Sequence, residues 1–234
     1  MAELKALIFD VDGTLYRQSP VRRAMLFRLI GAHLKTPRKG FSTFKALRAF
    51  RRAQEGLRTQ AGTFEDAATA QLKLACEWAG MKTEVMTPLV TRWMEREPLG
   101  LLAGALREGA SEMLQAARDR GLRLGVFSDY PALEKLKAMK IAHFFDAVVT
   151  AQDPEVRRFK PDPRGLLVTL RRLGVESHEA FYVGDRAEVD GVAAMRAGIR
   201  CAIITGPRLS LEVLGLSQAT NAREHLDLAS VQTR

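Results

Sequence analysis

The sequence predicts an α/β protein that consists of a parallel sheet with helices on both faces and an inserted all-helical segment. Two observations lead to this prediction. From about residue 101 onward, short apolar runs alternate with helical patterns, and alternating β and α units of this length favour a parallel sheet. Between residues 17 and 100 the pattern is helical throughout, which indicates a separate helical unit.

The first apolar run, at residues 6–9, ends in two carboxylates separated by one residue. Asp10 and Asp12 are followed by Gly13, which allows a sharp turn. This pattern is typical of a buried strand that carries charge at its C-terminal end, where α/β sheets keep their functional sites. Residues two apart in an extended chain project to the same side, so we expect Asp10 and Asp12 to face one small volume.

We expect four helices in the inserted segment, of which the first covers residues 20–35. Their apolar residues recur at helical spacing, and residues that start or stop helices separate them. These residues are Pro37 and Gly40, the capping-box pair Thr63 and Asp66, the stop at Gly80, and Thr87 with Pro88 as cap and first position of the fourth helix.

The rest of the chain supplies further strands and the polar residues that follow them. We expect strands at residues 122–127, 147–150, 180–183 and 200–204, and helices at residues 111–120, 131–139, 163–173 and 189–197. The carboxyl ends of parallel strands meet at one edge of a sheet, so polar residues there should converge. These residues are Asp10, Asp12, Ser128, Asp129 and Asp185, with Lys160 before a helix on that edge and Asp190 five residues beyond Asp185.

The convergence of carboxylates at one edge has a chemical consequence. Several carboxylates repel one another unless a cation or a shared proton intervenes. A hard divalent cation with oxygen ligands is the simplest compensation, and Mg²⁺ fits best. Each motif alone could be an ordinary turn or surface loop, but their order at successive strand ends favours a shared site.

The motifs resemble, in chain order, those of haloacid dehalogenase-like hydrolases. They are DVDGT at residues 10–14, the serine of VFSD, the lysine of FKPDP, and GDRAEVD. The resemblance is to the phosphatase branch with a helical cap after the first motif, as in phosphoglycolate phosphatases. It implies a Rossmann-like catalytic core at residues 1–16 and 101–234 and a helical cap domain at residues 17–100.

The resemblance also implies a role for each motif residue. Asp10 would attack the phosphoryl group and form an aspartyl-phosphate, while Asp12 would protonate the leaving oxygen and then activate water. Ser128 and Lys160 would bind the phosphoryl oxygens. The implied Mg²⁺ ligands are Asp10, the backbone carbonyl of Asp12, Asp185 and Asp190, the last directly or through water. One departure is Asp129, where many relatives carry asparagine, and it adds a negative charge near the phosphoryl site.

The leading functional expectation is a Mg²⁺-dependent phosphohydrolase that cleaves the phosphate monoester of a small metabolite, such as a phosphoglycolate, sugar phosphate or nucleotide. A phosphomutase and a metal-independent haloacid dehalogenase are alternatives within the family. Asp12, Asp185 and Asp190 argue against the dehalogenase. A non-catalytic nucleic-acid or protein-binding module is a further alternative, but a surface for phosphate backbones gains nothing from clustered carboxylates, so nucleic acid is not the expected partner.

Composition adds expectations about charge and compartment. The net charge of +9 favours anionic partners, and much of it lies in the first half of the helical segment, where we favour a solvated polar face. The apolar runs are strand-sized, so no membrane partner is expected, and no signal peptide is evident. Cys76 and Cys201 fit small buried hydrophobes in a reducing compartment, which favours the cytoplasm. Nothing in the sequence indicates an oligomeric state.

Overall fold

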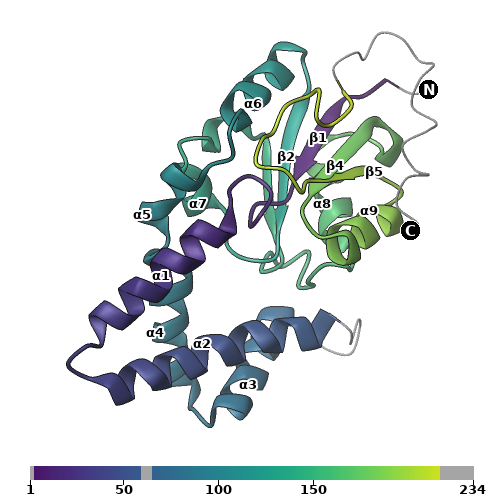
Figure 1. The fold of residues 1–234 in the computed structure, drawn as a ribbon. Helices are drawn as coiled ribbons and strands as arrows, with labels where there is room; N and C mark the ends of the chain where they lie inside the picture. Colours follow the sequence, from purple (N-terminus) through teal and green to yellow (C-terminus); the bar gives the residue numbers. More distant parts are fainter. Residues whose placement is uncertain (1–2, 59–64, 217–234) are drawn as a thin grey trace, which may run out of the picture.

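Five parallel strands form one sheet at the centre of the structure, as Figure 1 shows. The computed structural model describes residues 3–58 and 65–216. Hydrogen bonds join the strands in the order β3-β2-β1-β4-β5. The strands are β1 (Ala6–Phe9), β2 (Arg123–Ser128), β3 (Ala147–Thr150), β4 (Ala180–Gly184) and β5 (Arg200–Ile203). The predicted parallel α/β sheet is therefore confirmed.

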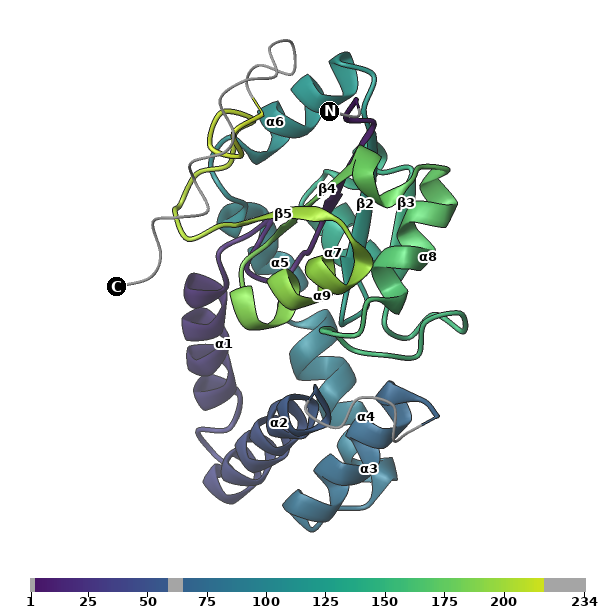
Figure 2. The ribbon, with the colours of Figure 1, turned by 90° about the vertical axis from the view of Figure 1, so that its right-hand side faces the viewer.

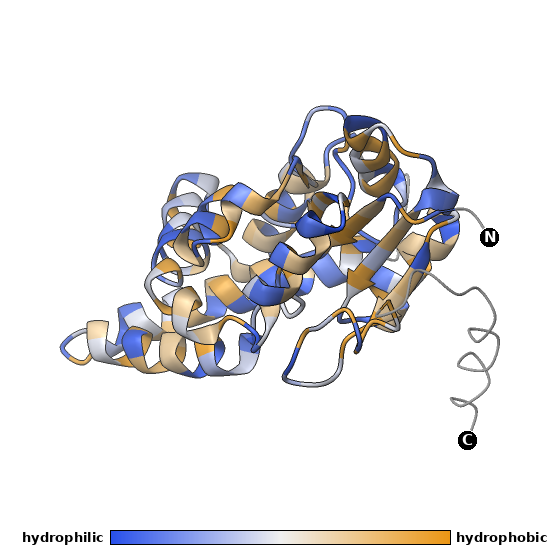
Figure 3. Cartoon of the chain, turned by 90° about the horizontal axis from the view of Figure 1, so that it is seen from above, coloured by the Kyte–Doolittle hydropathy of each residue, from blue (hydrophilic) through white to orange (hydrophobic). Residues whose placement is uncertain are grey.

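Helices cover both faces of the sheet, which explains why the central strands are apolar throughout (Figures 2 and 3). The flanking helices are α6 (Ala110–Asp119), α7 (Leu133–Ala138), α8 (Arg164–Leu173) and α9 (Val192–Ala197). Leu7 and Phe9 of β1 join the core cluster that contains α6 and α7. Ala6 and Ile8 join the opposite cluster with α8 and α9. All four side chains are fully buried, so β1 is the centre of a three-layer core.

The remaining helices include a group with its own apolar core. The α-helices among them are α1 (Gln18–Ala32), α2 (Pro37–Arg58), α3 (Ala67–Ala79), α4 (Thr83–Val90) and α5 (Leu99–Leu102). Short π or 3₁₀ segments are η1 (Thr91–Arg96), η2 (Ala103–Ala105), η3 (Ala142–Phe144), η4 (Ser177–Glu179) and η5 (Ala187–Gly191). In Figures 1 and 2, α2, α3 and α4 lie side by side apart from the sheet, and α1 leads from the sheet to α2. Ala53, Ala75 and Met86 are buried in the core that α2, α3 and α4 share.

The third helix of this group is shorter than its sequence pattern indicates. Asp66 is the N-cap of α3, and its Oδ1 accepts a hydrogen bond from the backbone N–H of Ala68 at 3.1 Å. The helix ends at Gly80, which adopts the predicted left-handed conformation with φ of 64°. Thr63, the other half of the expected capping box, lies outside the described residues.

Two expectations about single residues are wrong. Pro88 lies inside α4, which begins at Thr83, and the helical turns continue as η1. Met86 and Val90 are buried against α2 and α3, and this burial outweighs the helix penalty of about 3 kcal/mol for an internal proline.

Cys201 is exposed because β5 is an edge strand of the sheet, whereas Cys76 is buried as expected.

No helix of the described part combines the length and the hydropathy that crossing a bilayer requires.

The contact between α8 and β2 leads to a prediction about stability. A Cβ atom added to Gly165 would lie 2.0 Å from Cε2 of Phe127, a residue with no exposed surface. We expect Gly165→Ala to lower the free energy of unfolding by about 1 to 3 kcal/mol, measured by urea denaturation, because the buried ring must move. Gly31→Ala in α1 is the matched control, since its Cβ would meet nothing within 4 Å. Equal stability of both variants would contradict the tight α8–β2 contact.

Candidate active site

A buried lysine joins two of the aspartates at the carboxyl edge of the sheet. Asp10 directly follows β1, and its backbone N–H donates to the carbonyl of Val183 in β4 at 2.9 Å. Nζ of Lys160 lies 2.5 Å from Oδ1 of Asp10 and 2.7 Å from Oδ1 of Asp190. All three charged side chains are buried, so each needs the others to compensate its charge. The segments that carry them are thereby fixed relative to one another.

Asp190 on η5 is saturated with hydrogen bonds. Its Oδ1 accepts from Lys160 and from the Tyr182 hydroxyl at 2.8 Å. Its Oδ2 accepts from the backbone N–H groups of Asp185 at 3.2 Å and Arg186 at 3.0 Å. Four donors on two oxygens hold this carboxylate in one orientation, so it also positions the loop after β4.

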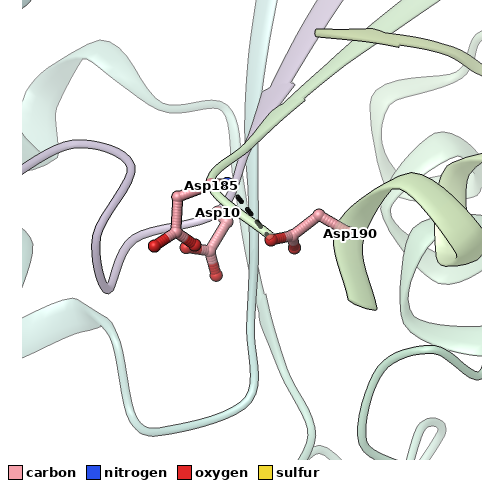
Figure 4. Close-up of side chains that lie close together, drawn as sticks. All are labelled: Asp10, Asp185 and Asp190. Carbon is pink, nitrogen blue, oxygen red and sulfur yellow. Dashed lines mark hydrogen bonds between the residues drawn. The ribbon is translucent and has the colours of Figure 1, made fainter. Parts of the chain in front are cut away.

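Asp185 completes a group of three carboxylates. Oxygen atoms of Asp10, Asp185 and Asp190 all lie within 4.8 Å of one another, and Figure 4 shows the three side chains together. Among the described residues, the Asp185 side chain has no hydrogen-bond or ion-pair partner. A Cβ at Gly13 would lie 2.0 Å from Oδ2 of Asp185, and Gly13 has φ of 107°. Glycine is therefore required at this position both for its conformation and for the approach of the carboxylate.

Asp12 has a different set of partners. Nζ of Lys135 on α7 lies 2.7 Å from its Oδ1 and 2.5 Å from its Oδ2, and the Tyr16 hydroxyl also donates to Oδ1. The backbone carbonyl of Asp12 accepts from Nε2 of Gln18 at 2.5 Å. The two aspartates of the first motif therefore lie in distinct environments, Asp10 against Lys160 and Asp12 against Lys135.

A polar cavity of about 410 Å³ contains most of the residues that the sequence pointed to. Asp10, Asp12, Lys160, Asp185 and Asp190 all line it. Ser128 does not line it; its hydroxyl is buried at the end of β2 and accepts from the backbone N–H of Tyr130 at 3.3 Å. The structure thus brings together every predicted site residue except this serine.

The additional negative charge of Asp129 has a cationic partner on the helical segment. Arg58, the last residue of α2, places Nη2 2.6 Å from Oδ2 of Asp129 and donates through Nη1 to the carbonyl of Lys160 at 2.5 Å. The backbone N–H of Lys160 donates to the other Asp129 oxygen at 2.9 Å. Nearby, Arg186 binds both carboxylate oxygens of Glu55 on α2, at 2.7 and 3.1 Å. These contacts connect α2 to the edge of the sheet.

The environments of the carboxylates move their pKa values in opposite directions. Burial, together with the Asp190 and Asp12 charges, raises the pKa of Asp10 to about 8 against the opposing charge of Lys160. Burial and Asp190 raise the pKa of Asp185 to about 6. Burial opposes ionisation of Asp12 too, but the Lys135 charge and the hydrogen bonds from Lys135 and Tyr16 lower its pKa. Two groups with raised pKa values and one with a lowered pKa are typical of an acid–base site.

The residues around the cavity fit a divalent cation. Asp185 offers a carboxylate that has no partner within the described ranges, and Asp10 lies beside it. The raised pKa values of both groups show that their charge is under-compensated, and a bound cation would lower them. Asp190 is already saturated, so it is better suited to orient these ligands than to coordinate directly. In the described part of the chain, the backbone carbonyl oxygen of Asp12 accepts one hydrogen bond, from Gln18, and its second lone pair is free to coordinate a cation.

Sequence reasoning missed two residues of the site. Lys135 lies in a short helix without a motif, and only the fold brings it to Asp12, so no local signal marks it. Tyr182 had a signal, because a tyrosine inside a fully buried strand needs a partner for its hydroxyl. Here the partners are Asp190 and Lys160, whose Nζ lies 3.2 Å from the hydroxyl oxygen.

Comparison with known proteins agrees with this geometry. Glyceraldehyde 3-phosphate phosphatase of Methanopyrus kandleri is 29% identical over 206 residues, which cover 84% of this chain and 82% of that protein. Phosphoserine phosphatase of Thermus thermophilus is 29% identical over 225 residues, covering 84% and 87%. The crystal structure of a HAD phosphatase from Thermococcus onnurineus superposes with a TM-score of 0.57 and 25% identity, covering 86% of each chain.

A family model also matches most of the chain. The model of haloacid dehalogenase-like hydrolases matches residues 4–198, which include β1 with its two aspartates, the end of β2, Lys160 and the loop after β4. The matched range thus contains every residue that lines the polar cavity. The chain belongs to the haloacid dehalogenase-like hydrolases.

Proposed function

We propose that this chain is a Mg²⁺-dependent phosphatase that hydrolyses phosphate monoesters of small metabolites through an aspartyl-phosphate on Asp10. The observation that carries the proposal is the cluster of Asp10, Lys160, Asp185 and Asp190, in which all but the half-buried Asp185 are buried and which lines a polar cavity. The relatives described above are named as phosphatases of a small sugar phosphate and of phosphoserine, which supports this substrate class.

Asp10 acts as the nucleophile, and Asp12 transfers the protons. An oxygen of Asp10 attacks phosphorus, the bond from phosphorus to the leaving oxygen breaks, and that oxygen takes a proton from Asp12. In the second step Asp12 accepts a proton from the water that hydrolyses the aspartyl-phosphate. The Lys135 charge favours the ionised form of Asp12, which suits the second step and opposes the protonated form that the first step uses. Lys160 offsets the charge that the phosphoryl oxygens share with Asp10.

Asp10 and Asp185, with the Asp12 carbonyl, would hold the Mg²⁺, and Asp190 would orient the loop that carries Asp185. When bound, the cation supplies positive charge that stabilises the transferring phosphoryl group. Gly13 contributes by allowing Asp185 to approach the loop after β1.

We further propose that residues 17–100 act as a cap over this site and that residues 1–16 and 101–234 form the catalytic core. Leu57 of α2 and Ala67 of α3 pack against Ala151 and Phe159, which belong to loops at the edge of the sheet. With the Arg58 contacts, this places the end of α2 beside the polar cavity, where it can restrict the entry of water. The buried Ser128 hydroxyl would then reach a phosphoryl oxygen only after a local rearrangement.

The dehalogenase alternative is less well supported. A dehalogenase releases halide, which needs no proton from a general acid, and it has no use for a cation held by carboxylates. The Asp185 carboxylate, which has no partner among the described residues and lies beside Asp10, therefore favours phosphate ester hydrolysis. Measuring released inorganic phosphate also distinguishes a phosphatase from a mutase, which returns the phosphoryl group to its substrate.

The first test concerns the nucleophile. Asp10→Asn should lower kcat for an aryl phosphate with Mg²⁺ by at least about a thousandfold, because an amide cannot form the aspartyl-phosphate. Excess EDTA should abolish the wild-type activity. Asp119→Asn, at an exposed position of α6, is the matched control and should keep wild-type activity. Release of inorganic phosphate that survives EDTA or Asp10→Asn would rule out the mechanism.

The second test detects the cation without using activity. Mg²⁺ at about ten times its dissociation constant should raise the wild-type Tm by about 2 to 5 °C, measured by differential scanning fluorimetry, and Asp185→Asn should lose most of that rise. Without Mg²⁺ at pH 7, Asp185→Asn should be at least as stable as wild type. The folded-state pKa of about 6 exceeds the unfolded value, so ionised Asp185 destabilises the fold above that pH. An equal Mg²⁺ effect on both proteins would argue against Asp185 as a ligand.

The third test concerns the contact between α2 and the sheet. Arg58→Gln leaves Asp129 buried without its cationic partner, so we expect it to lower the free energy of unfolding by about 3 kcal/mol in urea denaturation. Adding Asp129→Asn should recover part of this loss, because the uncompensated charge disappears. Strictly additive effects of the two substitutions would show that the pair does not couple the helical segment to the sheet.

A further inference from the structure

A second, smaller cavity adjoins the polar one. It has a volume of about 110 Å³ and largely apolar walls from α1, α2 and η1, including Met25, Phe50 and Trp93. Five residues line both cavities and therefore mark their junction. They are Asp12, Gln18, Arg22, Arg51 and Tyr130.

Two arginines at this junction differ from every other cation around the cavities. The others each have a carboxylate partner: Lys160 with Asp10 and Asp190, Arg58 with Asp129, Arg186 with Glu55, and Lys135 with Asp12. Within residues 3–58 and 65–216, Arg22 and Arg51 form no ion pair. Arg22 donates only to the side-chain oxygen of Gln18, and Arg51 has no hydrogen bond there. Glu95 also lines the smaller cavity without pairing with either arginine.

Two unpaired guanidinium groups at one junction leave a concentrated positive charge. Arg22 and Arg51 are both exposed, yet burial of part of Arg51 and the nearby Arg22 charge lower the pKa of the Arg51 guanidinium, so the two positive charges lie close enough to repel. A charge of this kind is stabilised when an anion binds between the two groups. Carboxylate and phosphate groups match the planar donors of arginine.

The junction lies on the side of the site where the leaving group departs, an assignment that rests on the proposed function. The smaller cavity is lined by Asp12 and Lys135 but not by Asp10, Lys160, Asp185 or Asp190. Asp12 is the proposed proton donor to the leaving oxygen, whereas the other cluster surrounds the transferring phosphoryl group. An anion between Arg22 and Arg51 would therefore belong to the leaving group.

We propose that Arg22 and Arg51 bind a second anionic group of the substrate, a carboxylate or a second phosphate, and so select phosphate monoesters that carry one. The apolar walls of the smaller cavity border this binding position and restrict its size. Arg22 lies four residues after Gln18, whose side chain also holds the Asp12 carbonyl, so the anion site adjoins the loop of the proposed proton donor.

The test compares substrates that differ only in the second anion. One pair is 3-phosphoglycerate and glycerol 3-phosphate, and the other is 1,3-propanediol bisphosphate and 3-hydroxypropyl phosphate. We expect the wild-type kcat/KM to be about tenfold to a hundredfold higher for the member with the second anion in at least one pair. The pair that shows the preference identifies the anion as carboxylate or phosphate. Arg22→Gln combined with Arg51→Gln should bring the ratio close to one.

Matched controls come from the neighbouring arginines. Arg23 follows Arg22 on α1 and lines neither cavity, and Arg52 follows Arg51 on α2 and lies over the Trp78 ring. Arg23→Gln and Arg52→Gln should keep the wild-type ratio. A wild-type ratio near one for both pairs would overturn the proposal, as would a double variant that slows both members of a pair equally, because the arginines would then serve the transferred phosphate. Asp10-dependent hydrolysis of an aryl phosphate tests the phosphatase activity separately.

Discussion

The ion pairs of Lys160 with Asp10 and Asp190 are the interaction on which the site depends most. A buried ammonium and two buried carboxylates are tolerated only when they stay together, because each would otherwise lose its hydration without compensation. The three residues come from the loop after β1, the loop before α8 and η5. Their mutual need for charge compensation therefore fixes three segments that the sequence separates by up to 180 residues.

The same principle extends from the sheet to the helical segment. Arg58 reaches the Lys160 carbonyl and the Asp129 carboxylate, so two residues at the edge of the sheet connect to α2. Apolar contacts also join the two parts: Leu57 and Phe159 share a buried cluster, and Val21 of α1 is buried in the core of the sheet. The arrangement of the helices beside the site thus depends on polar and apolar contacts together, whereas the sheet depends mainly on its apolar core.

Much of this architecture was predictable because its signals are local. Apolar runs that end in Asp10 and in Gly184 with Asp185 mark strand ends, and parallel strands bring such ends to one edge. The partners of Asp12 were not predictable, because Lys135 reaches it only through the packing of α7. Packing also overrides local preference at Pro88, where burial of neighbouring side chains keeps the helix intact. Which arginines of the basic segment face the cavity likewise depends on how α1 and α2 pack.

The polar contacts between α2 and the sheet respond unequally to ionic strength. The Arg186–Glu55 pair is solvent-exposed, so dissolved salt screens it, whereas the sheltered Arg58–Asp129 pair is screened much less. Raising the salt concentration would therefore loosen one side of the attachment before the other. Separation of the proposed cap from the sheet would then begin at Glu55, and the ionic composition of the medium would influence how long the cap stays over the site.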